Sequence, residues 1–298
     1  MAWQLPPLPA LRVFEAAARL GNFTRAAEEL GMTQAAVSYQ IKVLEERIGA
    51  PLFLRTARKV ILTETGEAMA MKATEAFSIL ADSFAAARNG ASTQLSLTTV
   101  QTFASNWLSE RLSGFQRLHP NIVVRLDTSS RMIDLVREDQ DLAIRVGNGR
   151  WPGLEAHFLF SCNYAPMLSP LLAETIGGLR EPADLYRLPL LGHTDPWWRS
   201  WFEAAGLAFD PEQVIPGPTL GVQFYEAVAA VAGQGVAVLT QALYQAHLAD
   251  GRLIRPFPIE GSDGHGYWLA YPHSRRNLPK IRQFRDWILA ETKNLREQ

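Results

Sequence analysis

The amino-acid sequence predicts a mostly α N-terminal winged helix-turn-helix, followed by an α/β region built from two Rossmann-like subdomains. Three observations carry this prediction. Two short helical patterns near the N-terminus are separated by a tight turn that contains Gly31. Two short strand patterns with basic residues between them come next. From about residue 93 onward, strand and helix patterns alternate, which is typical of a βα fold.

Length and composition favour an ordinary globular protein with more than one domain. The chain has 298 residues, 47% of them hydrophobic and 20% charged, which suggests two or three domains. The richest apolar window, AVAAVAGQGVAVL, is broken by Gly and Gln, which argues against a membrane span. We see no secretion-signal pattern at the N-terminus. A single cysteine, Cys162, excludes an internal disulfide framework, and these features together predict a cytoplasmic location.

Charge is distributed unevenly along the chain. Residues 1–63 hold eight basic and five acidic side chains, a net charge of +3, so the remainder carries −4 within the total of −1. A basic N-terminal segment on a mildly acidic body would turn that segment toward phosphate. The asymmetry is modest, and it indicates nucleic-acid binding only together with the motifs that follow.

The N-terminal segment should contain three short helices. The first can begin at Pro9, whose missing N–H is harmless in a first turn, and can end at Gly21. Thr24 can cap the second helix, TRAAEEL, and Gly31 stops it. Thr33 can cap the third helix in the same way.

The third helix, within residues 33–49, has one face that needs a core and one that fits DNA. Val37, Ile41, Leu44 and Ile48 share an apolar face. The opposite side is small and uncharged for two turns, unlike an ordinary solvated face. Such a side can approach base edges in a major groove. Two strands, near residues 52–54 and 60–62, should follow as a basic wing.

We predict DNA contacts from the third helix, from the start of the second helix and from the wing. Gln34 can pair with adenine, Lys42 can read guanine or hold phosphate, and Arg25 can hold the backbone. The predicted DNA-binding residues are Thr24, Arg25, Thr33, Gln34, Ala35, Ser38, Tyr39, Lys42, Arg55 and Arg58. For each of them, the alternative is a solvated surface residue or, for Thr33, a helix cap alone.

A long helix without proline is expected from residue 65 to about 88. Its small and apolar residues recur at spacings of four and three, as in a pairing seam. These residues are Met69, Ala73, Ala76, Leu80, Ser83 and Ala87. We predict that this helix pairs two chains; the alternative is that it packs on its own domain.

The expected domains are residues 1–64 for DNA binding, 65–89 for the linker helix and 90–298 for ligand binding. The last region divides into subdomain I, about 90–162 and 267–298, and subdomain II, about 163–266. Two crossovers, near 161–164 and 265–268, would leave a cleft between them. In subdomain I, strands at 94–100, 121–128 and 141–147 should alternate with helices at 107–119 and 132–139, giving a parallel sheet.

A small-molecule site is expected in that cleft, because ligands bind at the carboxyl ends of parallel strands. The turn at residues 101–104 lies there, before a helix N-terminus that favours an anion such as a carboxylate. Arg145 is an arginine in an otherwise apolar strand, for which a structural ion pair is the alternative role. The predicted ligand-binding residues are Thr99, Gln101, Thr102, Phe103, Ser129, Arg145, His193, Thr194 and Gln223.

Other functions find little support in the sequence. There is no G-x-S-x-G elbow, no Walker loop and no G-x-G-x-x-G motif, so we predict no enzyme activity and no cofactor. The six His residues include no i, i+4 pair, so no metal site is expected. Cys162 is more easily explained as a small core residue than as a redox sensor. Nonspecific DNA packaging would need a far more basic chain.

The ordered string from Leu8 to Met69 resembles the LysR-type transcriptional regulators. FTRAAEEL, TQAAVS, LEERIGAPLF and LTETG stand in it at the family's spacing. Weaker similarity continues through DLAIRVG, WPGLEAHFLF and AGQGVAVL. Within the family, the chain is similar to the branch of the glycine-cleavage activator and the β-lactamase regulator.

This resemblance implies a winged helix-turn-helix, a dimerising linker helix and a periplasmic-binding-protein-like effector domain. It implies a regulator that binds a double-stranded DNA operator and responds to a small-molecule effector. It also implies a homodimer or a homotetramer, as a dimer of dimers, and it makes RNA polymerase a candidate partner. A family member that acts without a small-molecule effector remains the alternative.

Overall fold

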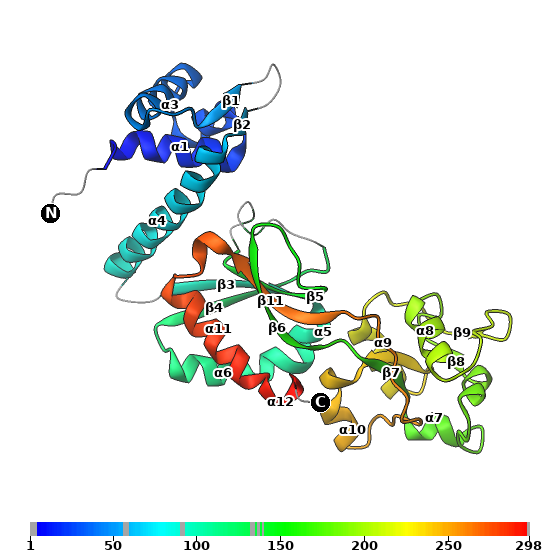
Figure 1. Cartoon of the computed structure of the whole chain (residues 1–298). Helices are drawn as coiled ribbons and strands as arrows, with labels where there is room; N and C mark the ends of the chain where they lie inside the picture. The colour runs from blue at the N-terminus through cyan, green and yellow to red at the C-terminus, as the bar shows by residue number, and fades with distance from the viewer. Residues whose placement is uncertain are drawn as a thin grey trace.

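The computed structural model describes residues 5–55, 60–89, 93–131, 135, 138 and 140–296. Along the chain, a small head of helices with a two-stranded wing leads into one long helix and then into a larger α/β body (Figure 1). Arg58 lies outside the described residues, as does most of the helix expected over 132–139.

The head is built from three helices around one apolar core. Val13 and Phe14 of the first helix pack with Val37, Ile41 and Leu44 of the third, and all five are almost completely buried. The head consists of α1 (Leu8–Leu20), α2 (Phe23–Leu30), α3 (Gln34–Ile48), β1 (Phe53–Arg55) and β2 (Val60–Leu62). The apolar face predicted for the third helix is therefore confirmed over three of its four residues. Its last residue stays exposed, because the helix ends there.

The helix caps in the head are only partly as predicted. Thr33 caps α3, since its Oγ1 accepts a hydrogen bond from the N–H of Ala36 at 3.2 Å. For α2 the prediction of Thr24 is wrong. Asn22 is the cap, and its Oδ1 accepts from the N–H groups of Thr24 at 2.8 Å and Arg25 at 3.1 Å. Asn at this position satisfies the same free donors that Thr would have taken.

The long helix α4 (Glu64–Asn89) divides into two parts by what it packs against. Ala73 is buried in the core of the head, and Met69 packs partly buried against it. Farther along, Leu80 is 46% and Phe84 70% exposed. The predicted seam is therefore used by the head itself in its first half. In the second half, Leu80 and Phe84 present apolar surface to solvent.

Subdomain I is a five-stranded sheet in the order β4-β3-β5-β11-β6. Its strands are β3 (Thr93–Thr99), β4 (Ile122–Thr128), β5 (Leu142–Gly147), β6 (Leu154–Ser161) and β11 (Gly266–Pro272). β3 is parallel to β4 and β5, whereas β11 is antiparallel to β5 and β6. The parallel arrangement predicted for β3, β4 and β5 is thus confirmed. β11 returns from subdomain II at the edge where β6 leaves, so it must run in the opposite direction.

Helices α6 and α11 lie along one side of this sheet (Figure 1). The helical elements of subdomain I are α5 (Gln101–Phe103), the π-helical stretch η1 (Ala104–Leu108), α6 (Ser109–Leu118), η4 (His273–Arg275), α11 (Pro279–Glu291) and α12 (Lys293–Arg296). Thr292 separates α11 from α12 at the C-terminal end of the body. On the linker side, Asn277 donates a hydrogen bond to Glu75 of α4 at 2.9 Å.

Subdomain II is smaller and its strands are short. β7 pairs with β10 in antiparallel fashion, and β8 pairs with β9 in parallel. Its elements are β7 (Tyr164–Met167), α7 (Pro170–Glu174), η2 (Pro182–Arg187), β8 (Pro189–Leu190), α8 (Pro196–Ala204), β9 (Ile215–Pro216), α9 (Gln223–Val231), β10 (Ala237–Thr240), η3 (Gln241–Leu243) and α10 (Gln245–Ala249).

The main core of the body runs without interruption through both subdomains. Leu97 and Phe160 of subdomain I belong to the same buried cluster as Leu239 and Tyr244 of subdomain II. A second cluster, which includes Trp198 of α8, lies wholly in subdomain II. Within the described residues, no helix is long and apolar enough to cross a membrane.

Candidate nucleic-acid interface and subdomain cleft

The outward face of α3 presents short, uncharged side chains. Gln34 and Ala35 are exposed, Tyr39 is 64% exposed and Ser38 is half-buried. These residues lie opposite the buried side of the helix described above. Lys42 follows one turn later, with its Nζ 3.7 Å from Oε1 of Glu46. Because both groups are largely exposed, this ion pair is weak, and the lysine remains available to a phosphate or a base.

The start of α2 lies beside this face but offers fewer free N–H groups than the sequence suggested. Asn22 already accepts from the backbone of Thr24 and Arg25. The side chains of Thr24 and Arg25 are exposed, so they can still contact phosphate. Thr33 is used as a cap, yet it too is exposed at the start of α3.

The wing is an antiparallel pair in which Arg55 of β1 stands opposite Val60 of β2. The predicted strand positions are confirmed to within a residue. The Arg58 prediction cannot be followed further, since that residue lies outside the described part of the chain.

An ion-pair cluster holds α1 against α2 beneath the interface. Arg19 contacts Glu15 on its own helix at 3.0 Å and Glu29 on α2 at 2.5 Å. The hydrogen bond from Arg19 is the main reason why the pKa of Glu29 lies below its usual value. The cluster thus links α1 and α2 at the surface of the head, above the apolar core that both share with α3.

The cleft between the subdomains contains a pocket of about 410 Å³. Subdomain I supplies the start of α5 and the loop after β4, and subdomain II supplies the start of α9. The lining residues are Val100, Gln101, Thr102, Thr128, Ser129, Ser130, Arg131, Gly221, Val222 and Tyr225. Hydroxyl groups, one guanidinium and an apolar wall thus meet in one place.

Three of the predicted ligand-binding residues line this pocket: Gln101, Thr102 and Ser129. Gln101 is already the first residue of the helix, and Val100 before it provides no side-chain cap. The first N–H groups of that helix therefore lack a side-chain acceptor, which favours an anion. Thr99 lies at the adjoining strand end, fully buried, and its Oγ1 has no hydrogen-bond partner among the described atoms.

Phe103 and Arg145 do not line the pocket. Phe103 is fully buried, with its ring stacked on those of Trp107 and Tyr267 at 5.1 and 5.7 Å. Its placement is therefore that of a core residue. Arg145 is 6% exposed and donates to Oγ1 of Thr98 at 2.8 Å. Burial lowers the pKa of its guanidinium. Neither the predicted pocket contact nor the alternative ion pair is found for Arg145 within the described residues.

The predicted residues of subdomain II also lie outside the pocket lining. Thr194 is exposed and His193 is half-buried, both between β8 and α8. Gln223 begins α9 but points to Thr240: its Oε1 accepts from the N–H of Thr240 at 3.0 Å, and its Nε2 lies 3.3 Å from the Thr240 hydroxyl. Its amide is therefore occupied by a contact within the protein.

The sequence reasoning missed two side chains that shape the pocket. Arg131 follows Ser129 and Ser130 directly, and its guanidinium pairs with Glu138. Tyr225 is 49% exposed on the wall that α9 provides. A basic residue directly after a strand-end serine pair was a usable signal for Arg131. The position of Tyr225 has no comparable local signal.

Among the described residues, no group of three or more His, Cys, Asp or Glu side chains is placed to hold a metal ion. Near the pocket, burial is the main cause that raises the pKa of Glu226, and the nearby Asp195 adds to it. This carboxyl group is 7% exposed on α9 and is not part of the pocket lining.

Comparison with known families matches both parts of the chain. Residues 8–67 match the family described as "Bacterial regulatory helix-turn-helix protein, lysR family", and residues 88–293 match "LysR substrate binding domain". Both describe transcriptional regulators and not enzymes.

Curated relatives and solved structures agree with these matches. The chain is 39% identical to the glycine cleavage system transcriptional activator of Escherichia coli (strain K12), over 98% of this chain and 95% of that protein. It is 40% identical to the HTH-type transcriptional activator AmpR of Pseudomonas aeruginosa, over 95% of each. The effector domain of the latter superposes with a TM-score of 0.59 and 35% identity, over 67% of this chain and 96% of that domain. CrgA of Neisseria meningitidis, a LysR-type regulator, gives a TM-score of 0.59 and 26% identity over 97% of this chain and 99% of that one.

Proposed function

The chain belongs to the LysR family of transcriptional regulators, and on that premise we propose that it binds a partly palindromic DNA operator through α3 and reads a small-molecule effector in the subdomain cleft. The observation that carries the DNA-binding proposal is the contrast between the two sides of α3. One side is locked into the head by Val37, Ile41 and Leu44, and the other exposes Gln34 and Ala35. Such a helix can enter a major groove without losing its own core.

The proposed DNA contacts divide by chemistry. Gln34, Ala35 and Ser38 read base edges, since amide, methyl and hydroxyl groups suit them. Tyr39 and Lys42 reach the edge of the groove. Thr24, Arg25, Thr33, Arg55 and Arg58 hold the phosphate backbone, which fixes the register without reading sequence.

The proposed effector carries a carboxylate. Thr102 and Ser129 offer hydroxyl donors beside the uncapped start of the helix that begins at Gln101. Arg131 stands at the same pocket as a cation, and Tyr225 offers an apolar surface for the remainder of the ligand. Thr99 lies behind this group. The proposed contacts exclude Phe103, Arg145, His193, Thr194 and Gln223, which lie outside the pocket lining.

The remaining parts of the proposal concern assembly and context. The domains are taken as 1–64, 65–89 and 90–298, and the chain acts in the cytoplasm as a homodimer or a dimer of dimers. The two relatives compared above are named as activators, and we extend activation, with RNA polymerase as a partner, to this chain.

The proposed mechanism is a shift between two populations of the protein. An effector that binds one closure of the cleft better than another stabilises that closure by its difference in affinity. The linker helix α4 packs on the head and also contacts η4 and Asn277 of the body, so a change in the body can alter the spacing of two heads.

Two measurements on the full chain test the proposal. Thermal-shift screening against amino acids, purines, aromatic acids and cell-wall fragments should find a ligand, because binding to the native state at a hundredfold excess over Kd adds about 2.7 kcal/mol of stability. A DNA site selected in vitro should then change in footprint length, affinity or bend when the ligand is added. If a ligand binds and leaves all three unchanged, the coupling fails. If no ligand binds while DNA is still recognised, the chain acts without a small-molecule effector.

A further inference from the structure

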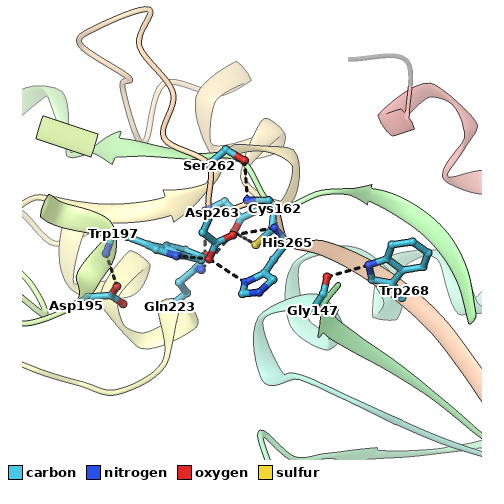
Figure 2. A network of polar contacts seen from close by, with 11 residues as sticks. Gly147, Cys162, Asp195, Trp197, Gln223, Ser262, Asp263, His265 and Trp268 are labelled. Atoms are coloured by element: carbon cyan, nitrogen blue, oxygen red, sulfur yellow. Dashed lines mark hydrogen bonds and ion pairs between the residues drawn. The ribbon is translucent and has the colours of Figure 1, made fainter. Parts of the chain in front are cut away.

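A polar network at the two crossovers is centred on Asp263 (Figure 2). The Asp263 Oδ1 accepts from the backbone N–H of His265 at 3.0 Å. Its Oδ2 accepts from Nε1 of Trp197 at 3.0 Å and lies 3.0 Å from Nδ1 of His265. Burial would raise the pKa of Asp263, but the donors of Trp197 and His265 outweigh it and lower the pKa. One ionised carboxylate thus ties the second crossover to α8 of subdomain II.

The tryptophan that donates to Asp263 is itself held in place. Its ring stacks on Tyr164, with centroids 4.2 Å apart and planes 6° from parallel. Tyr164 begins β7, directly after the first crossover, and exchanges two backbone hydrogen bonds with Gly261 just before the second. The donor of Trp197 is therefore preorganised relative to both crossovers.

A second set of contacts leads from the cleft to the same crossover. Gln223, between the lining residues Val222 and Tyr225, is hydrogen-bonded to Thr240 as described above. The Thr240 hydroxyl lies 3.4 Å from Sγ of Cys162, and the N–H of Cys162 donates to the carbonyl of His265 at 3.0 Å. Figure 2 shows Gln223, Cys162 and His265 beside the Asp263 contacts. A shift of α9 would therefore reach His265, which Asp263 binds, through the contacts of Gln223, Thr240 and Cys162.

We propose that Asp263 is a positioning residue that sets the resting angle between the two subdomains by pinning the second crossover to α8. The Asp263 contacts anchor the turn from Gly264 to Gly266 on α8. Gly264 has a φ of +74°, a conformation that side-chain-bearing residues rarely adopt. This inference rests on the proposed effector cleft and deepens it, since the pinned angle is what an effector would have to change.

The test is a distance measurement between the subdomains in the full chain without ligand. Ser113→Cys on α6 and Ala204→Cys on α8 place spin labels at exposed positions. The native Cys162 is buried, and burial raises the pKa of its thiol to about 12, so it stays unlabelled. Excess unlabelled protein removes distances between chains. The distance distribution is then compared for the parent, Asp263→Ala and Trp197→Phe.

Asp250→Ala is the matched control. Asp250 makes the same local contacts as Asp263, to the backbone N–H and the side chain of the residue two positions on, at 3.2 and 2.8 Å. Among the described residues it has no donor from another element comparable to Trp197. Removing it therefore tests the local turn alone.

We expect Asp263→Ala and Trp197→Phe to shift or broaden the distribution in the same sense, and Asp250→Ala to leave it unchanged. The inference is overturned if folded Asp263→Ala gives the parent distribution, or if Trp197→Phe, which keeps the stacked ring, has no effect. If Asp263→Ala does not fold, the distance distribution of Trp197→Phe alone decides whether the inference stands. The distance distribution is measured without any ligand. A ligand screen that finds no binder would therefore count against the effector cleft and not against the role of Asp263.

Discussion

Single residues on the head separate the two kinds of DNA contact. Gln34→Ala removes a side chain that can pair with a base, and should weaken binding to the preferred site by roughly 1–3 kcal/mol while relaxing its sequence choice. Arg25→Ala removes a proposed phosphate contact and should weaken binding to all sequences about equally. Both residues are exposed, so neither change disturbs the core. Binding isotherms on the selected site and on scrambled DNA measure both effects. If Gln34→Ala weakened all sequences equally and Arg25→Ala relaxed sequence choice, the roles proposed for the two residues would be reversed.

His157 should make the stability of the body depend on pH. Its Nε2 lies 2.7 Å from the hydroxyl of Tyr271 and 3.3 Å from Oε1 of Glu155. Burial lowers the pKa of His157 below its ordinary 6.5, and the nearby Glu155 opposes this only in part. The unfolded chain therefore takes up a proton more readily than the folded one. Stability is fully present above pH 6.5 and decreases as the pH falls below that value.

The measurement for His157 is the unfolding free energy from urea titrations between neutral and mildly acidic pH. His157→Gln keeps a hydrogen-bonding side chain that does not titrate, so its stability should fall less steeply with acid. His119→Gln is a suitable control, since that residue is a half-buried histidine elsewhere in subdomain I. Equal slopes for parent and His157→Gln would show that this side chain does not contribute.

At the scale of elements, the capping of α2 gives a clear prediction. Asn22→Ala leaves the N–H groups of Thr24 and Arg25 without their acceptor, and should destabilise the head by about 1 kcal/mol. Thr24→Ala should have little effect on stability, because its side chain caps nothing. Thermal unfolding of the two variants checks this. A larger loss of stability for Thr24→Ala than for Asn22→Ala would show that Thr24 is the cap, as the sequence suggested.

The elements of the head could be predicted from the sequence because local patterns determine them. The apolar period of α3 requires one buried side whatever the partner, and Thr33 is the only cap type next to its start. At α2 two residues of capping type, Asn22 and Thr24, stand two apart, and the sequence prediction chose Thr24, whereas Asn22 is the cap. In the body, β11 lies between β5 and β6, residues more than a hundred positions away in the chain, so neither its place nor its direction has a local signal.

In the candidate pocket, too, the sequence predicted only those residues that a local or topological pattern marks. Thr102 and Ser129 were found because strand ends in a βα fold meet at one edge, which is a rule of topology. Tyr225 was missed because it reaches that edge from the other subdomain. Gln223 and Phe103 were misplaced for a related reason, since each lies next to lining residues in sequence. The side chain of Gln223 is directed to Thr240, and that of Phe103 into the core.

At the scale of the whole molecule, the continuous core limits what an effector can do. Because one buried cluster includes Phe160, Leu239 and Tyr244 from both subdomains, wide opening of the cleft would expose apolar surface near the crossovers. Small rotations that keep this core packed are the motions that remain. Under the proposed mechanism, the signal would therefore be a modest change of the angle between the subdomains.

Assembly of two chains gives the last prediction. Phe84 is 70% exposed on the half of α4 that does not pack on the head, and Leu80 is exposed one turn before it. If this half pairs with a second copy, Phe84→Glu would bury a charge in an apolar seam, which is strongly unfavourable. We expect the variant to be monomeric in sedimentation equilibrium and to lose affinity for a two-half-site operator, since a single head holds only one half-site. Met71→Glu is the control: it is also exposed on α4 but lies roughly 140° around the helix from Phe84. A Phe84→Glu chain with the same mass as the parent would show that the copies associate through another surface.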